Sequence, residues 1–388
     1  MKLPKFMLTC IPLVLFTCNF AFAQQPVSVP FTDKRWSIQS QAQKVESFQG
    51  YESLNLQRGQ AVLDEKFLNG IIEFDIWLTE QPSFSGCLFR MTSPGNYEEF
   101  YLRPHLVGYP DAYQYTPVFN ADPAWQLYHD QHDQDANGIN WNPRGKPVGY
   151  NGVLTYKLNQ WTHIKLVVNG TQAELYLNNS NQPAAFIRKL GMKPVAGPVG
   201  LTSTAGPAWF ANFTVTHIDS PGLQNKEQAD IVTPPNTIMT WDVSNAFKED
   251  VVQNLTRLDL DSKLFDRLNW ISVTAEASGV VNLARVARPA DSSNTILVKL
   301  TITSDRNQVK KLDLGYSDRV RAFCNGQILY SGTTIFRSRD YRYLGTIGYF
   351  DAIYLPLKKG QNTIILAVSE TFGGWGIMGK IEPEGIRL

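Results

Sequence analysis

Polar and charged side chains alternate with apolar ones in three segments, Gly70–Leu78, Gly86–Met91 and Tyr97–His105. This alternation is typical of β-strands, because successive side chains point to opposite faces of a sheet. If the three strands are neighbours, one face gathers carboxylates, arginines, a histidine and aromatic rings. The residues predicted for that face are Glu73, Asp75, Trp77, Arg90, Glu99, Tyr101, Arg103 and His105.

A surface of this composition is suited to binding carbohydrate. The C–H faces of a sugar stack on aromatic rings, and its hydroxyl groups exchange hydrogen bonds with arginine and carboxylate side chains. The structural alternative is a solvated sheet face with cross-strand ion pairs. Large aromatic residues are uncommon on solvated faces, and this favours ligand binding.

Aromatic residues make up 12% of the chain, and five of them lie between Pro110 and His129. From this segment we expect a rim that stacks against a ligand, formed by Gln114, Tyr115, Trp125 and Tyr128. In the second half of the chain, Trp375 is flanked by glycines. Glycines permit a tight loop that exposes the ring to a sugar, although a ring that closes the end of a β-sandwich fits the same pattern.

The segment Asp133-x-Asp135-x-Asn137-Gly138 has the spacing of the first half of a calcium loop. An EF-hand needs a glutamate six residues after the glycine, where this chain has Arg144. The segment therefore indicates either a calcium site of another kind or a hydrated loop. No other cofactor is predicted.

The first 23 residues have the pattern of a secretory signal peptide. Two lysines precede an apolar stretch, which ends at Ala21-Phe22-Ala23. We therefore expect a secreted or periplasmic protein. No other apolar run is long enough to span a membrane.

The remaining chain is long enough for two domains and nearly neutral, with 36 basic and 35 acidic residues in the full sequence of 388. This balance argues against a nucleic-acid partner and fits a neutral ligand. Short strand patterns run from 27 to 217 and again from 239 to 388, and the polar, proline-containing segment 218–238 between them reads as a linker. The predicted fold class is all-β, with two antiparallel β-sandwich (jelly-roll) domains.

The first domain resembles the concanavalin A-like jelly rolls of the laminin-G and 3-keto-disaccharide hydrolase kind found in secreted bacterial proteins. The resemblance rests on Phe67–Asp75, Gly86–Arg90, Trp161–Val168 and Phe210–Val215. Retaining β-glucanases of this superfold carry Glu-x-Asp-x-x-Glu on one strand, and here the third position is Leu78. Because leucine cannot protonate a leaving group, the glucanase mechanism is disfavoured.

The resemblance leaves room for a different reaction, the cleavage of 3-keto-glycosides. Elimination next to a ketone needs a base and a group that stabilises the resulting oxyanion. Glu99 or His105 is the candidate base, and Arg103 or Arg90 the candidate oxyanion donor.

The second domain resembles the galactose-binding-like β-sandwich appended to many secreted glycosidases. The segments that carry this resemblance are Val320–Gly332 and Tyr354–Val368, with their Asn-Gly and Lys-Gly-x-Asn turns. The sequence thus predicts an exported protein that binds a neutral glycan on the polar, aromatic sheet face of the first domain. A glycoside-cleaving enzyme and a protein-adhesion module remain the alternatives, and the oligomeric state is open.

Overall fold

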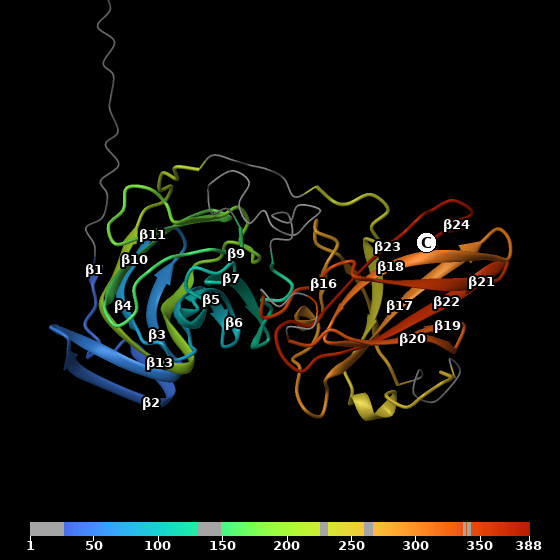
Figure 1. Ribbon diagram of the computed structural model, residues 1–388, viewed down its shortest axis with the longest axis horizontal. Helices are drawn as coiled ribbons and strands as arrows, with labels where there is room; N and C mark the ends of the chain where they lie inside the picture. Colours follow the sequence, from blue (N-terminus) through green and yellow to red (C-terminus); the bar gives the residue numbers. More distant parts are fainter. Residues whose placement is uncertain (1–26, 130–148, 226–231, 260–266, 337–338, 340–342) are drawn as a thin grey trace, which may run out of the picture.

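The computed structural model describes residues 27–129, 149–225, 232–259, 267–336, 339 and 343–388. These residues form two antiparallel β-sandwiches that lie side by side along the long axis of the molecule (Figure 1). The predicted fold class is confirmed. Within the described ranges, no helix has the length and apolar character needed to cross a membrane. The predicted signal peptide of residues 1–23 and the calcium-loop residues Asp133, Asp135 and Asn137 lie outside the described residues.

The first sandwich is one continuous sheet with the order β12-β11-β10-β4-β13-β5-β6-β7-β8. Strand β3 pairs with β13 and with β2, β1 pairs with β13, and β9 pairs with β7. The bounds are β1 (Val27–Ser28), β2 (Trp36–Phe48), β3 (Tyr51–Phe67), β4 (Gly70–Leu78), β5 (Phe84–Ser93), β6 (Asn96–Leu102), β7 (Tyr113–Phe119), β8 (Asp122–Pro123), β9 (Asn151–Gly152), β10 (Trp161–Asn169), β11 (Gln172–Leu177), β12 (Ala185–Ile187) and β13 (Gly197–His217).

The sheet becomes a sandwich because its longest strand bends. The first half of β13 pairs with β5 and the second half with β4, and the register shifts between Ser203 and Pro207. A bulge of this kind turns a strand from one layer into the other. The two layers enclose one apolar core, which includes Phe74 of β4 and Phe100 of β6.

The second sandwich has two sheets, in the orders β15-β14-β17-β22-β19-β20 and β16-β23-β18-β21, with β24 paired to β17. Trp241 and Trp375 are fully buried in the core between them. The bounds are β14 (Thr240–Ser244), β15 (Trp270–Thr274), β16 (Val281–Asn282), β17 (Thr295–Ser304), β18 (Gln308–Ser317), β19 (Arg319–Cys324), β20 (Gln327–Thr333), β21 (Asp351–Leu357), β22 (Gly360–Ser369), β23 (Gly376–Ile381) and β24 (Ile386–Arg387). Three 3₁₀ turns complete the described elements of the chain: η1 (Pro104–Leu106), η3 (Glu249–Val251) and η4 (Leu283–Arg285).

The turn between β19 and β20 follows the sequence closely. Cys324 and Gln327 pair across a two-residue turn made by Asn325 and Gly326, both with positive φ. This geometry matches the right-handed twist of the strands, and Asn-Gly adopts it at little cost. The turn predicted from the Asn-Gly pair is confirmed.

Candidate functional site

The single polar face expected from β4, β5 and β6 is not formed. Two strands, β13 and β5, lie between β4 and β6 in the sheet order. Phe74 and Phe100 point into the same core from the two layers, so the alternate residues of β4 and β6 point away from that core on separate surfaces. The prediction failed because alternation fixes which side chains share a face, whereas strand order is set by the bend in β13.

The outer face of β4 carries a small charged cluster. His163 of β10 lies between two carboxylates, with Nδ1 2.8 Å from Asp75 Oδ1 and Nε2 3.6 Å from Glu73 Oε1. Asn212 donates a hydrogen bond of 2.6 Å to Asp75 Oδ2. Hydrogen bonds to Asp75 and then to Glu73 raise the pKa of His163 to about 9, so the imidazole is cationic at neutral pH and compensates its neighbours.

Aromatic rings cover one end of this outer face. Trp77 lies 5.7 Å from Trp161 and 5.3 Å from Phe48, which stacks on Trp209 at 4.5 Å. The indole nitrogen of Trp161 donates to the backbone carbonyl of Gln49, in the turn between β2 and β3. These half-buried rings therefore hold the β2–β3 hairpin against the sheet.

On the other layer, Arg103 is completely buried and ion-paired to Asp111. Its guanidinium also donates to the Asp111 carbonyl (3.2 Å), to the Tyr101 hydroxyl (3.4 Å) and to Gln114 Oε1 (3.3 Å). Phe84 and Tyr101 flank the guanidinium at 5.8 and 5.3 Å. Most donors of Arg103 are thus used inside the fold, and an oxyanion would have to displace them.

The two candidate bases lie near this arginine in different surroundings. Glu99 shares the β6 face with Tyr101, and its burial raises its pKa to about 7. His105 is not on the strand, because β6 ends at Leu102 and Pro104 opens η1. Proline has no N–H to continue a ladder. The His105 ring instead packs edge-on to Phe84, at 5.6 Å.

Several predicted rim residues are interior. Tyr115 is 0% exposed, and its hydroxyl donates to Glu98. Gln114 is also 0% exposed and donates to the carbonyls of Tyr115 and Tyr128 at 2.7 Å. Arg90 fastens the turn before β4, since its guanidinium donates to Leu68 O and Asn69 Oδ1. Gln114 and Tyr115 therefore offer no exposed face to a sugar, and their predicted place on a rim is corrected. Arg90 was predicted on the polar sheet face, and at 1% exposed it is buried instead.

Trp375 is likewise 0% exposed, and its indole nitrogen donates to Val368 O at 3.0 Å. The neighbouring glycines have another role than exposing the ring. A Cβ on Gly373 would lie 2.6 Å from the ring of Trp125, and one on Gly376 2.3 Å from Leu127. The loop is glycine-rich because the first sandwich packs directly against it.

Trp125 and its neighbours therefore form part of the contact between the sandwiches. Gln126 N donates to Gly373 O, and Ile347 N donates to Gln126 O, both at 2.9 Å. Trp375 N donates to Asp122 Oδ2 at 3.2 Å. Leu344 N donates to Asp111 Oδ2 at 3.0 Å, so the residue that pairs with Arg103 also binds the second sandwich.

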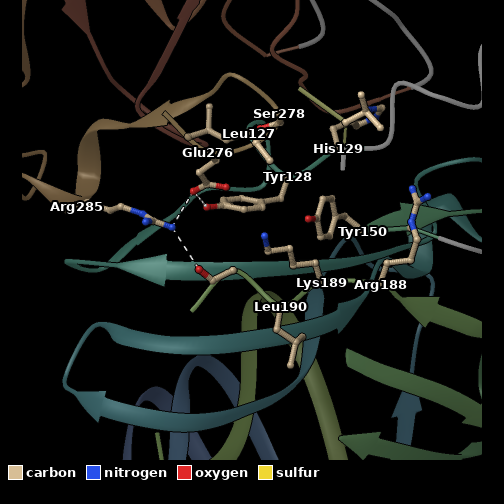
Figure 2. Close-up of a pocket in the computed structure, with 14 residues that line it drawn as sticks. Leu127, Tyr128, His129, Tyr150, Arg188, Lys189, Leu190, Glu276, Ser278 and Arg285 are labelled. Carbon is tan, nitrogen blue, oxygen red and sulfur yellow. Dashed lines mark hydrogen bonds and ion pairs between the residues drawn. The ribbon is translucent and has the colours of Figure 1, made fainter. Parts of the chain in front are cut away.

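A pocket opens where the two sandwiches meet. Its volume is about 470 Å³, in the range of small-ligand sites. The first sandwich contributes Tyr128 and Tyr150, whose rings meet edge-to-face at 5.6 Å (Figure 2). The full described lining is Leu127, Tyr128, His129, Gly149, Tyr150, Arg188, Lys189, Leu190, Gly191, Val232, Glu276, Ala277, Ser278 and Arg285.

A hydrogen-bond network crosses this pocket from one sandwich to the other (Figure 2). The Tyr128 hydroxyl donates to Glu276 Oε1 at 2.6 Å, and Arg285 donates to the same oxygen at 2.7 Å and to Gly191 O at 3.2 Å. Burial and the Glu276 carboxylate hold the pKa of Tyr128 well above its usual value, so its hydroxyl remains a donor. The pocket is thereby held in a defined shape.

The sequence analysis found one member of this pocket, Tyr128, and missed the others. Glu276 and Arg285 belong to a different domain, and nothing in their local sequence indicates a partner 148 residues away from Glu276. The adjacent Arg188 and Lys189 form a basic pair on the approach to β13, and this pair is the one local signal that was available.

No protein-family model matches the chain, and no curated protein matches it. Among solved structures, it is similar to the carbohydrate-binding module CBM66 from Bacillus subtilis, at 12% identity and a TM-score of 0.33, over 46% of this chain and 93% of that one. A Bacillus licheniformis β-glucanase matches at 8% identity and a TM-score of 0.34, over 50% and 98%. A family 35 carbohydrate-binding module from an environmental isolate matches at 14% and 0.18, over 24% and 70%. These values do not place the chain in a family.

Proposed function

We propose that this chain binds carbohydrate in the pocket between its two sandwiches. The observation that carries the proposal is the pocket itself, a concave site of about 470 Å³ in which tyrosine rings lie beside charged groups from both sandwiches. Rings accept the C–H faces of a sugar, and the charged groups exchange strong hydrogen bonds with its hydroxyls. A bound saccharide would contact both sandwiches at once.

Binding fits the geometry better than cleavage. Elimination from a keto-sugar requires a group that is available to stabilise the oxyanion. Arg103 is already paired with Asp111, and Arg90 is only 1% exposed. Glu99 has the raised pKa of a general base, but only 7% of the residue is exposed. The pocket between the sandwiches contains none of these residues among its described lining.

The outer face of β4 is a second candidate surface for a glycan, as the sequence analysis proposed. Glu73, Asp75 and the half-buried Trp77 lie there together with His163. His163 already compensates both carboxylates, and the neighbouring rings hold the β2–β3 hairpin. This face therefore leaves fewer groups for a ligand than the pocket does.

Binding at the pocket is tested with a Tyr150→Ala variant on a glycan array and in affinity gels. Removal of a stacking ring is expected to weaken binding about tenfold, equivalent to about 1.4 kcal/mol. Tyr109→Ala is the matched control, because Tyr109 is 64% exposed and lies outside the pocket lining. Trp77→Ala tests the β4 face. A loss of binding in Trp77→Ala with none in Tyr150→Ala would move the site to β4, and no binding to any glycan would refute the proposal.

We further propose that the protein acts outside the cytoplasm. This rests on the residue pattern of 1–23, a basic start followed by an apolar stretch and a small-x-small end. Fractionation of cells that express the full chain tests it: the mature protein is expected in the periplasm or medium, starting near Gln24.

A further inference from the structure

We propose that the pocket between the sandwiches selects saccharides that carry a negatively charged group, with Lys189 as the side chain that receives it. This inference rests on the proposed binding of carbohydrate at the same pocket and names the class of ligand. The negative group is a uronate carboxylate or a sulfate ester, because a lysine ammonium binds either as a point charge.

Basic side chains outnumber acidic ones among the described residues that line the pocket. Glu276 is the only carboxylate among the described residues that line it, against Arg188, Lys189 and Arg285. Arg285 lies 2.7 Å from Glu276 and compensates its charge. Lys189 remains as an exposed cation among the described residues of the lining, although the whole chain is nearly neutral.

Lys189 is one of the residues that line the pocket. Its side chain extends under the rings of Tyr128 and Tyr150, on the pocket side of the segment that leads to β13, whereas Arg188 points to the other end (Figure 2). Lys189 is exposed and forms no ion pair with a carboxylate of the described residues. Its charge does reach Glu276, where it opposes the rise in pKa that burial causes.

Neutral and acidic ligands differ in how well they compensate the loss of water from the Lys189 ammonium. A neutral sugar that enters the pocket displaces water from the Lys189 ammonium and returns only hydrogen bonds to hydroxyl groups. A carboxylate or sulfate replaces that water with an ion pair, in which the Coulomb attraction of opposite charges is added to the hydrogen bond. The tyrosine rings contribute equally to both kinds of sugar, so the lysine supplies the discrimination.

The experiment compares the full chain with Lys189→Met on an array of neutral, uronate-containing and sulfated oligosaccharides. Methionine keeps much of the length and apolar stem of lysine and removes its charge. We expect the wild-type protein to bind acidic glycans in preference to neutral ones. The affinity of Lys189→Met for acidic glycans is expected to be about tenfold lower. Raising the salt concentration is expected to weaken wild-type binding and to affect the variant less.

Lys193→Met is the matched control, because Lys193 is an exposed lysine four residues away that does not line the pocket. It changes the net charge equally and is expected to leave the preference intact. Binding of neutral glycans at least as strong as that of acidic ones, reduced by Tyr150→Ala, would overturn the acidic preference and leave the proposed function standing. Equal effects of Lys189→Met and Lys193→Met would also overturn it. Silence on the whole array would overturn both proposals.

Discussion

Two groups of charged side chains at the contact between the sandwiches have opposite surroundings. In the pocket, Lys189 is exposed and has no carboxylate partner in the described part of the chain. Elsewhere in the contact, Asp122, Asp318 and Glu370 form a carboxylate cluster in which each residue is at most 5% exposed. The pocket thus has positive charge open to a ligand, and the cluster has acidic groups closed to solvent.

The two groups are stabilised by different means. Each carboxylate of the cluster accepts backbone N–H groups, such as Trp375 N on Asp122 and Gly374 N on Glu370. Burial and mutual repulsion raise the pKa of Glu370 well above its usual value, and burial raises that of Asp122 to about 6. The buried acidic groups therefore take up protons more readily than exposed ones, whereas the exposed side chain of Lys189 is accessible to a ligand.

The largest loss of stability is expected when the buried carboxylate of Asp111 is removed. Its carboxylate pairs with Arg103 and accepts Leu344 N from the second sandwich. Asp111→Ala leaves a fully buried arginine without its partner, and we expect a loss of about 3 to 5 kcal/mol in the free energy of unfolding. Urea denaturation measures it. Asp250→Ala, which removes an exposed partner of Lys248, is expected to leave the midpoint unchanged. Equal losses of unfolding free energy in the two variants would contradict the burial of the Arg103–Asp111 pair.

The carboxylate cluster predicts a pH dependence with a definite sign. Because the folded pKa of Asp122 is raised, the folded state binds the proton more tightly, and stability decreases as the pH rises from about 4 to about 6. The charge of Arg319 lowers the pKa of both Asp318 and Glu370, so these two pKa values rise less than burial alone would raise them. Asp122→Asn removes one titrating group and keeps an acceptor for Trp375 N.

We therefore expect Asp122→Asn to match the wild type near pH 4 and to be more stable by about 3 kcal/mol above pH 7. Thermal unfolding across this pH range measures the difference. Asp291→Asn, at an exposed carboxylate of the second sandwich, is the control and is expected to run parallel to the wild type. A constant difference between Asp122→Asn and wild type at every pH would contradict the proton uptake.

The smallest of these effects concerns packing at the contact. Gly373 has φ of +115°, and a Cβ there would lie 2.5 Å from Gln126 Nε2 and 2.6 Å from the Trp125 ring. Gly360 has φ of +96° but nothing within 4 Å of such a Cβ. Gly373→Ala and Gly360→Ala therefore share backbone strain, and only the first adds a clash. We expect Gly373→Ala to lose about 1 to 2 kcal/mol more than Gly360→Ala in urea denaturation. Equal losses would show that the sandwiches separate or adjust without cost.

Much of the fold was predictable because its causes are local. Alternation in Gly70–Leu78 places Phe74, Ile76 and Leu78 in the core, and each is at most 2% exposed. The Asn325-Gly326 pair makes the turn that its positive φ values allow. In the strand Gly70–Leu78, Glu73 and Asp75 lie on the face opposite the core, where both contact His163, since a strand has a period of two.

The site was much less predictable, and particular residues show why. Arg103 was predicted to face a ligand, but the fold brings it into a buried ion pair with Asp111, which the sequence analysis had not singled out. Trp375 and its glycines fit an exposed sugar platform and a ring that closes the end of a sandwich equally well, and the burial of Trp375 in the second core decides between them. Glu276 became a site residue only because the second sandwich places it against Tyr128.

The sequence by itself determined the class of this protein: two β-sandwiches of nearly neutral overall charge, with aromatic residues concentrated around 97–129. Periodicity and turn residues act over a few positions, so one chain is enough to read them. The tertiary structure decided which residues are buried and which are accessible to a ligand. The bend in β13 separated β4 from β6, the core of the second sandwich buried Trp375, and the contact between the sandwiches left Lys189 facing a pocket. Burial and charge pairing depend on neighbours distant in the sequence. Those neighbours decide whether a charged group forms contacts within the fold or is accessible to a ligand.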